Sequence, residues 1–332
     1  MKIPANLQKL WILGAVTLFT VCSSRLPKYK PAMIQQVTSD STMTMPADTV
    51  FTQLNDSLEI TPVLSRTESL NREIVSDSSD ALIQDIVYDS INVSVIDDST
   101  MPQVEFRKVS NEAFQVGEML EFQIGWKLFK AGTATMTVGD TVWNENRSCY
   151  QIKTTANSSS VIDVFYKVRD KVESIIDQDG FFPWKFKKQL REGTFRRDRF
   201  TLFDPYQKMA FVKKDTVNIP LYVQDVLSSF YYVRTLPLEV GKHFDIDNIS
   251  DKKVYPLRIL VHKKEQVKVP AGKFNCIVVE PVLRGEGLFN QKGRLVIWLT
   301  DDARKMPVMM KSEVFIGTVD IKLTKYKNNI NS

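Results

Sequence analysis

Short runs that alternate apolar with polar residues fill positions 105–328, and this period of two constrains the fold most strongly. The first run places Leu120, Phe122, Ile124, Trp126 and Leu128 on one side of an extended chain. Such alternation is typical of a strand with one buried face. We expect further strands at 133–138, 150–152, 166–173, 184–191, 194–200, 209–213, 267–269, 274–279, 295–299 and 314–323.

Turn residues separate these runs at regular intervals. Examples are Ala131-Gly132, Asp179-Gly180 and Pro270-Ala271-Gly272, in which proline or glycine favours the turn dihedrals. Short antiparallel strands joined in this way are typical of a barrel or a large curved sheet. We therefore predict a mostly β fold, a single antiparallel curved sheet or open β-barrel, for residues 105–328.

One segment of this domain has a helical period instead. Residues 224–235 place Val226, Leu227, Phe230 and Val233 on one face, and Pro237 ends the pattern. We expect one short helix that covers the mouth or the concave face of the sheet.

The N-terminal segment has the pattern of a signal peptide, which we place at residues 1–22. Lys2 and Lys9 precede an apolar run at 10–21, and no acidic residue occurs among the first 30 positions. A membrane span needs roughly 20 apolar residues, so this run is too short to be one.

Cys22 follows the apolar run directly, where bacterial lipoproteins carry the cysteine that becomes acylated. Val21 stands where that signal usually has Gly, Ala or Ser, so a secretory signal cut near Ser24 is the alternative. Acylation would hold the mature chain on a membrane surface. We expect an exported cell-envelope protein that faces the periplasm or the surface and is anchored in the outer membrane.

Residues 23–104 are acidic and rich in Ser and Thr, and we interpret them as a disordered tether. Positions 31–100 hold 12 acidic residues against Arg66 and Arg72, a net charge of −10. Low hydrophobicity with charge of one sign does not offset the entropy cost of ordering. Docking of the short apolar segment 81–87 on a partner is the alternative.

The β-patterned part of the chain is distinctly basic. The whole chain carries +5 and residues 1–30 also carry +5, so residues 101–332 carry +10. A basic domain is attracted to anionic lipid headgroups, to acidic glycans or to an acidic tether. We expect no nucleic-acid partner, because an exported protein seldom meets nucleic acid.

Sequence motifs of common catalytic machinery are absent. The domain has two histidines, His243 and His262, and no H-E-x-x-H, G-x-S-x-G, paired C-x-x-C or phosphate-binding loop. We expect both histidines on the surface, and no enzymatic activity, catalytic residue, metal or cofactor.

Two sets of residues leave alternatives open. Cys149 and Cys276 form a disulfide or remain two buried thiols. The strand carboxylates form cross-strand ion pairs, or two of them face each other across a cleft as in glycoside hydrolases. These carboxylates are Asp170, Glu173, Asp198, Glu280, Asp301 and Asp302.

Basic residues concentrate on two neighbouring predicted strands. Lys185, Lys187 and Arg191 lie on one strand, and Arg197 and Arg199 lie across the predicted hairpin. They form either a solvated face of the sheet or a binding surface for phosphate or carboxylate groups.

Five short motifs mark the positions of strands and turns in this domain. They are Gly117-Glu118 opening a strand that ends at Ala131-Gly132, Phe165–Val168, Tyr231–Arg234 leading to Gly241, Val269–Phe274, and Ile297–Leu299 followed by Asp301 or Asp302 and Pro307-Val308. With these motifs, residues 114–328 resemble the exported bacterial proteins of the domain-of-unknown-function 3108 family. The resemblance implies export but no activity, substrate or catalytic residue.

Our leading hypothesis is a non-catalytic envelope lipoprotein that binds a hydrophobic or amphipathic ligand such as lipid. An exported sheet curved around a helix is also similar to the open-barrel carriers of lipids and lipidated proteins, although fold alone does not determine function. Aromatic residues would line the interior of the domain, and cations on the strands would bind an anionic headgroup of the ligand. These residues are Trp126, Trp184, Phe230, Trp298, Lys185, Lys187, Arg191, Arg197 and Arg199.

Two other functions remain open. The domain could be a scaffold or adaptor that binds a protein or glycan partner through a sheet edge or its basic face. It could also be a carboxylate-dependent glycan hydrolase, which requires two carboxyls on opposite sides of a cleft.

Overall fold

The computed structural model describes residues 105–126, 129–144, 146–250, 252–283, 294–314 and 317–327. The predicted signal peptide at 1–22 with Cys22, and the predicted tether at 23–104, lie outside the described residues.

The described residues form one antiparallel sheet of 14 strands with the order β8-β7-β6-β5-β4-β3-β2-β1-β14-β13-β12-β11-β10-β9. The predicted mostly β fold is confirmed. The strands are β1 (Met119–Trp126), β2 (Phe129–Asn144), β3 (Arg147–Ser158), β4 (Arg169–Asp177), β5 (Pro183–Glu192), β6 (Phe195–Asp204), β7 (Met209–Val212), β8 (Asp215–Asn218), β9 (His243–Ser250), β10 (Lys253–Val269), β11 (Gly272–Leu283), β12 (Arg294–Thr300), β13 (Pro307–Val314) and β14 (Gly317–Lys327).

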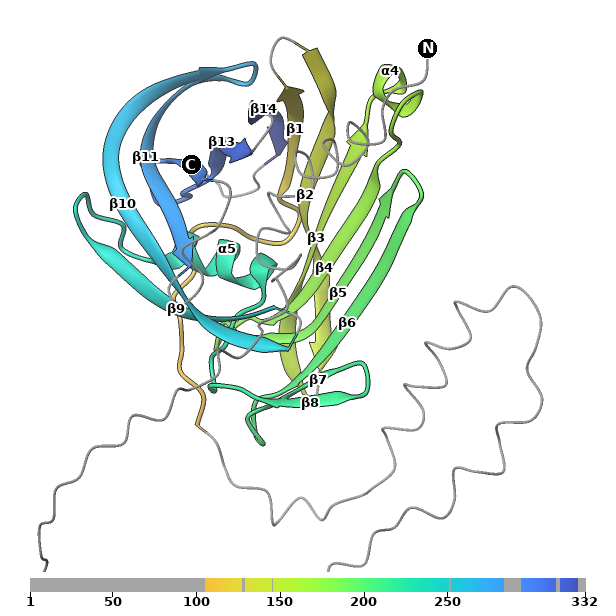
Figure 1. Ribbon diagram of the computed structural model, residues 1–332. Helices are drawn as coiled ribbons and strands as arrows, with labels where there is room; N and C mark the ends of the chain where they lie inside the picture. The colour runs from red at the N-terminus through yellow and green to blue at the C-terminus, as the bar shows by residue number, and fades with distance from the viewer. Residues whose placement is uncertain are drawn as a thin grey trace, which may run out of the picture. The chain divides into compact units, whose positions relative to one another are not determined.

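The sheet is a meander that is joined in its middle and open at its ends. The first strand, β1, pairs with the last strand, β14. The chain runs outward from β1 to the edge strand β8 and returns from the other edge strand, β9, to β14. Helix α5 (Val226–Thr235) lies between these two edge strands in the sequence. The sheet curls around α5, and the long strands β10 and β11 form one wall of the curve (Figure 1).

Helix α5 begins at a buried cap that also attaches it to the sheet. The Asp225 carboxylate accepts hydrogen bonds from the backbone N–H groups of Leu227 and Ser228, at 2.7 and 2.9 Å. The Ser174 hydroxyl of β4 donates to the same carboxylate at 2.7 Å. Burial raises the pKa of Asp225 to about 6. The cap therefore fixes the start of the helix against one strand of the sheet.

The buried face of α5 differs in part from the predicted one. Leu227 and Val233 are buried as expected, but Val226 and Phe230 are only partly buried. Tyr231 and Arg234 are buried instead. On this side the Arg234 guanidinium is paired with the buried carboxylate of Glu118, directly before β1, and hydropathy alone does not predict this contact.

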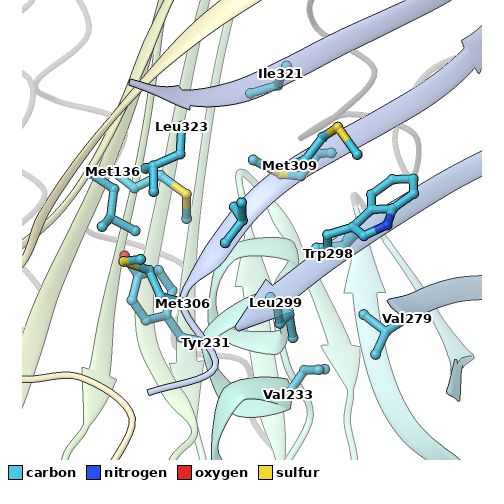
Figure 2. Packing of buried hydrophobic residues seen from close by; sticks show 14 of the residues in the cluster. Met136, Tyr231, Val233, Val279, Trp298, Leu299, Met306, Met309, Ile321 and Leu323 are labelled. Carbon is cyan, nitrogen blue, oxygen red and sulfur yellow. The ribbon is translucent and has the colours of Figure 1, made fainter. Parts of the chain in front are cut away.

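The main hydrophobic core combines the inner face of the sheet with α5. Alternation in β1 buries Leu120, Phe122 and Ile124, as the sequence predicts. Figure 2 shows Met136 of β2, Leu323 of β14 and Tyr231 of α5 converging on the same region. Two smaller clusters are separate, one around Phe203 and Val223 and one around Cys149 and Trp184.

Several strands differ from the predicted runs. β8 and β9 were not predicted, β10 begins well before the predicted run at 267–269, and β13 shares only Val314 with the predicted run at 314–323, which belongs mainly to β14. β13 buries Val308, Met309 and Met310 in succession. A strand buried on both faces has no alternation to detect.

A single turn of helix, α4 (Ser160–Asp163), connects β3 to β4. Neither α4 nor α5, the two helices among the described residues, is long and apolar enough to cross a bilayer.

Candidate functional site

The predicted aromatic residues lie in two different clusters. Trp126, Phe230 and Trp298 pack in or against the main core, and the Trp298 Nε1 donates to Glu265 Oε1 at 2.7 Å. Trp184 packs with Cys149 and Phe182 in a separate cluster. The structure thus brings three of the four aromatics to one interior.

The predicted cations lie on neighbouring strands but on opposite faces of the sheet. In the β5–β6 register, Leu190 is opposite Arg197 and Lys188 is opposite Arg199. Directly opposed residues share a face. Lys188 is in turn opposite Val172, which belongs to the main core, so Arg197 and Arg199 lie on the inner face.

The other three cations lie on the outer face of the sheet, because successive side chains of a strand alternate between its two faces. Lys185, Lys187 and Arg191 occupy the odd-numbered positions of β5, whereas the inner positions are even-numbered. Arg191 is paired there with Asp198 at 2.7 Å. The five cations therefore do not form one surface, because the register across the hairpin separates them.

Lys188 joins the inner cations, although the sequence analysis did not single it out. It is buried and lies between the inner positions Phe186 and Leu190. The period of two through Trp184, Phe186 and Leu190 places position 188 inward, so the signal was present in the sequence.

Two carboxyls are buried on the same inner face. Asp170 of β4 is 5 % exposed and Glu192 of β5 is 2 % exposed. Val168 bridges to Glu192, which brings the end of β5 beside the start of β4. The two side chains hydrogen-bond each other, and Asp170 Oδ1 accepts the Arg191 backbone N–H at 2.8 Å.

Burial sets the protonation of this pair. Burial, together with the charge and the hydrogen bond of Asp170, raises the pKa of Glu192 to about 8. Burial also raises the pKa of Asp170, and the hydrogen bonds from Arg191 and Glu192 oppose this rise. The pair therefore retains a proton at neutral pH.

One polar atom beside this pair has hydrogen-bonding capacity to spare. The Tyr166 hydroxyl is buried without a hydrogen-bond partner in the described part of the chain, whereas the buried oxygens Asp170 Oδ2 and Glu192 Oε1 belong to the pair that shares a proton. Buried polar atoms are usually paired, so this hydroxyl offers capacity for a bound group. We call Tyr166, Asp170, Lys188, Glu192, Arg197 and Arg199 the inner polar patch.

The other five carboxylates that the sequence analysis singled out form ion pairs, which was one of its two interpretations. Each of the five lies within 4 Å of a Lys, Arg or His nitrogen. The pairs are Glu173 with Lys153, Asp198 with Arg191, Glu280 with Arg294 and His262, Asp301 with Lys264, and Asp302 with Arg304.

The geometry of Asp170 and Glu192 does not suit glycoside hydrolysis. Hydrolases hold their two carboxyls roughly 5 to 9.5 Å apart, on opposite sides of the sugar. Asp170 and Glu192 are in direct hydrogen-bonding contact. Over the ranges that the structure describes, no three His, Cys, Asp or Glu side chains are grouped as metal ligands.

The two strand cysteines are free thiols. Cys149 and Cys276 are both buried, and they lie in different hydrophobic clusters. Burial raises the pKa of each thiol to about 12. Of the two alternatives, the structure has the pair of buried thiols.

The sheet that carries this patch corresponds to a known family. The model of the family described as "Protein of unknown function (DUF3108)" matches residues 121–324. The chain belongs to the DUF3108 family. The DUF3108 match runs from β1 to β14 and includes every residue of the inner polar patch. A comparison with curated proteins finds no match.

Three solved structures are similar to this DUF3108 chain over about two thirds of its length. A β-barrel-like protein of the DUF1849 family from Brucella abortus is 11 % identical, with a TM-score of 0.47, covering 65 % of this chain and 99 % of its own. A candidate lipoprotein from Parabacteroides distasonis is 10 % identical, with a TM-score of 0.32, over 67 % of this chain and 100 % of its own. An exported-protein candidate with a YmcC-like fold from Bacteroides fragilis is 12 % identical, with a TM-score of 0.28, over 67 % and 100 %.

Proposed function

We propose that this DUF3108 domain is a non-catalytic cell-envelope protein that binds a hydrophobic or amphipathic molecule, such as a lipid, on its inner face. One observation carries the proposal: the inner face of β4–β6 joins an apolar interior to a cluster of cations. Val172 and Ile176 belong to the main core, and Lys188 and Arg199 follow on the same face. An amphipathic anion needs these two environments next to each other.

The protonation of the carboxyl pair favours an anionic head. Because the carboxyl pair retains a proton at neutral pH, it places less negative charge beside Lys188, Arg197 and Arg199 on the inner face. Guanidinium groups bind phosphate and carboxylate oxygens through charge-assisted hydrogen bonds. The buried Tyr166 hydroxyl beside the pair suits a hydrogen-bonding group of the same head.

The proposed location follows from the N-terminal sequence. The apolar run at 10–21 and Cys22 support export and a lipid anchor in the outer membrane. The ligand would then be a component of the envelope that surrounds the domain.

Native mass spectrometry of the full chain, extracted in mild detergent, tests this function. We expect a bound lipid in the wild type and at least about a tenfold loss of it in the Arg197→Gln/Arg199→Gln variant, because each charge-assisted hydrogen bond contributes about 1.5–3 kcal/mol. The matched control is Lys185→Gln/Lys187→Gln, which removes two cations from the outer face of β5. We expect the control to retain the lipid.

Three outcomes would overturn the proposal. They are a wild-type chain without lipid, equal losses in the two variants, and a stoichiometric protein partner that is cross-linked in cells while lipid is absent. The last outcome would favour the scaffold function.

A further inference from the structure

Five large apolar side chains are exposed at one end of the sheet. We call Phe129, Val161, Val164, Phe165 and Phe195 the apolar rim, and they are between 43 and 78 % exposed. Single exposed apolar residues are common on protein surfaces. Several that gather in one place mark a contact with another molecule.

Strand pairing places these residues at the same end of neighbouring strands. Phe129 is the first residue of β2, and Phe195 is the first residue of β6, opposite Glu192. Val161, Val164 and Phe165 lie in the β3–β4 connection that contains α4.

Backbone pairing across this end of the sheet connects the five strands β2 to β6. Gly132 is opposite Ser158, the Ser158 N–H donates to the Val168 carbonyl at 3.1 Å, and Val168 bridges to Glu192. At about 4.8 Å per strand, the rim extends about 20 Å from β2 to β6. Figure 1 shows α4 at this end of the sheet.

The connection that contains α4 does not use its apolar side chains for folding. No residue of α4 is buried. Polar contacts hold the connection instead: Asp163 is paired with Arg169, and the Ser159 backbone N–H donates to the Ala131 carbonyl at 2.8 Å. Val161 and Val164 are therefore displayed on a fixed support without a role in the core.

Cations surround the apolar rim. Lys130, Lys167 and Arg196 are exposed and directly adjacent in sequence to Phe129, to the Phe165-Tyr166 pair and to Phe195. The one carboxylate of α4, Asp163, is neutralised by Arg169. Residues 101–332 carry +10 as a whole, so the charge of the rim has the sign of the entire domain.

We propose that the apolar rim docks on an anionic lipid bilayer. Apolar side chains that project from three chain connections and alternate with cations match the interface of a membrane, where acyl chains lie directly beneath anionic headgroups. Burial of one Val or Phe side chain changes a binding constant by about tenfold or more. Each Lys or Arg near an anionic surface contributes about fivefold. This inference does not depend on a ligand at the inner polar patch.

Site-specific photo-crosslinking with the full chain tests the docking. Benzoylphenylalanine would replace Phe129, Phe165 or Phe195, and as a control Trp143, which is 72 % exposed near the other end of β2. The vesicles contain equal parts of phosphatidylglycerol and phosphatidylcholine, or phosphatidylcholine alone. We expect lipid cross-links at the three rim positions with the anionic vesicles, at least about tenfold above position 143. A lipid anchor alone does not favour one end of the sheet.

Substitutions separate the apolar and the ionic contributions. With the probe at 129, Val164→Asp/Phe165→Asp should lower the lipid cross-link at least about tenfold, whereas Trp143→Asp should leave it unchanged. Lys130→Gln/Lys167→Gln/Arg196→Gln should lower it only on anionic vesicles. All these positions are exposed, so the variants should fold as the wild type does.

Other results would overturn the docking. They are equal lipid yields at 129 and 143, yields that the rim substitutions do not change, and cross-links in cells that join the rim to a protein. Lipid retained by the rim variants in native mass spectrometry would show that the inner-face function stands when the docking fails.

Discussion

At the scale of single residues, Glu192 is a carboxyl that the fold buries. It is the last residue of β5 and precedes Gly193 in the hairpin that leads to β6. The structure buries it beside Asp170, because the bridge to Val168 brings the hairpin over the start of β4. The turn itself needs glycine, since Gly193 has a φ of +55° and an added Cβ would lie 2.7 Å from the Tyr166 ring.

The raised pKa of Glu192 predicts a pH-dependent stability. Between pH 4.5, its ordinary pKa, and about 8, the folded chain keeps a proton that the unfolded chain releases. The free energy of unfolding contributed by Glu192 is thus complete below pH 4.5 and falls as the pH rises, by at most about 1.4 kcal/mol per unit. Urea unfolding at pH 5 and pH 8 should show a smaller decrease for Glu192→Gln than for the wild type.

Glu173→Gln is the matched control for this prediction. It changes a partly exposed carboxylate on the outer face of β4, which is paired with Lys153. This variant should keep the pH dependence of the wild type. If Glu192→Gln kept it as well, the buried proton would have to lie on another group.

At the scale of elements, a buried ion pair connects the end of α5 with the start of β1. Arg234 donates to both carboxylate oxygens of Glu118, at 2.7 and 2.8 Å, and both side chains are fully buried. Arg234 also donates to the Ala113 carbonyl at 3.0 Å, and the rings of Phe114 and Tyr231 lie beside its guanidinium. This contact determines which side of the helix faces the sheet.

Removing one partner of this pair should destabilise the fold strongly. Glu118→Gln leaves a buried guanidinium without its counter-charge, which costs about 3–5 kcal/mol. The double variant Glu118→Gln/Arg234→Met should recover part of this loss, because the unpaired charge is then absent. Chemical denaturation of the wild type, both single variants and the double variant measures the coupling. A loss below about 0.5 kcal/mol in Glu118→Gln would contradict a buried pair.

At the scale of the whole molecule, one continuous sheet carries separate hydrophobic clusters. The strand order places β1 and β14 together in its middle, so the ends of the domain sequence are joined there. Cys276 lies in the main core and Cys149 in the cluster of Trp184. The two thiols therefore report on two parts of the same fold.

Thiol labelling should show whether these parts open together. In a Cys22→Ser background, we expect Cys149 and Cys276 to react at least about a thousand times more slowly in the native chain than in urea, because labelling requires unfolding. Mass spectrometry of the labelled peptides gives the two rates. Equal native rates would indicate one cooperative unit, and a faster rate at Cys149 would indicate local opening of its cluster. If the chain took up no label in urea without a reductant, Cys149 and Cys276 would be joined in a disulfide, which would contradict two free thiols.

The sequence by itself determined the features that depend on neighbouring residues. Alternation at 120–126, the turn at 270–272 and the helical period at 224–235 predicted strands, a hairpin and α5, since local periodicity decides which face of an element is apolar. The motifs also predicted the DUF3108 family.

Only the tertiary structure decided what depends on distant pairing. The register of β5 with β6 moved Arg197 and Arg199 to the inner face, away from Lys185 and Lys187. Proximity of Glu118 to Arg234 turned a charged side of α5 inward. These outcomes follow from which strand lies beside which, and a one-residue change of register would reverse the face of every side chain without any change in the local pattern.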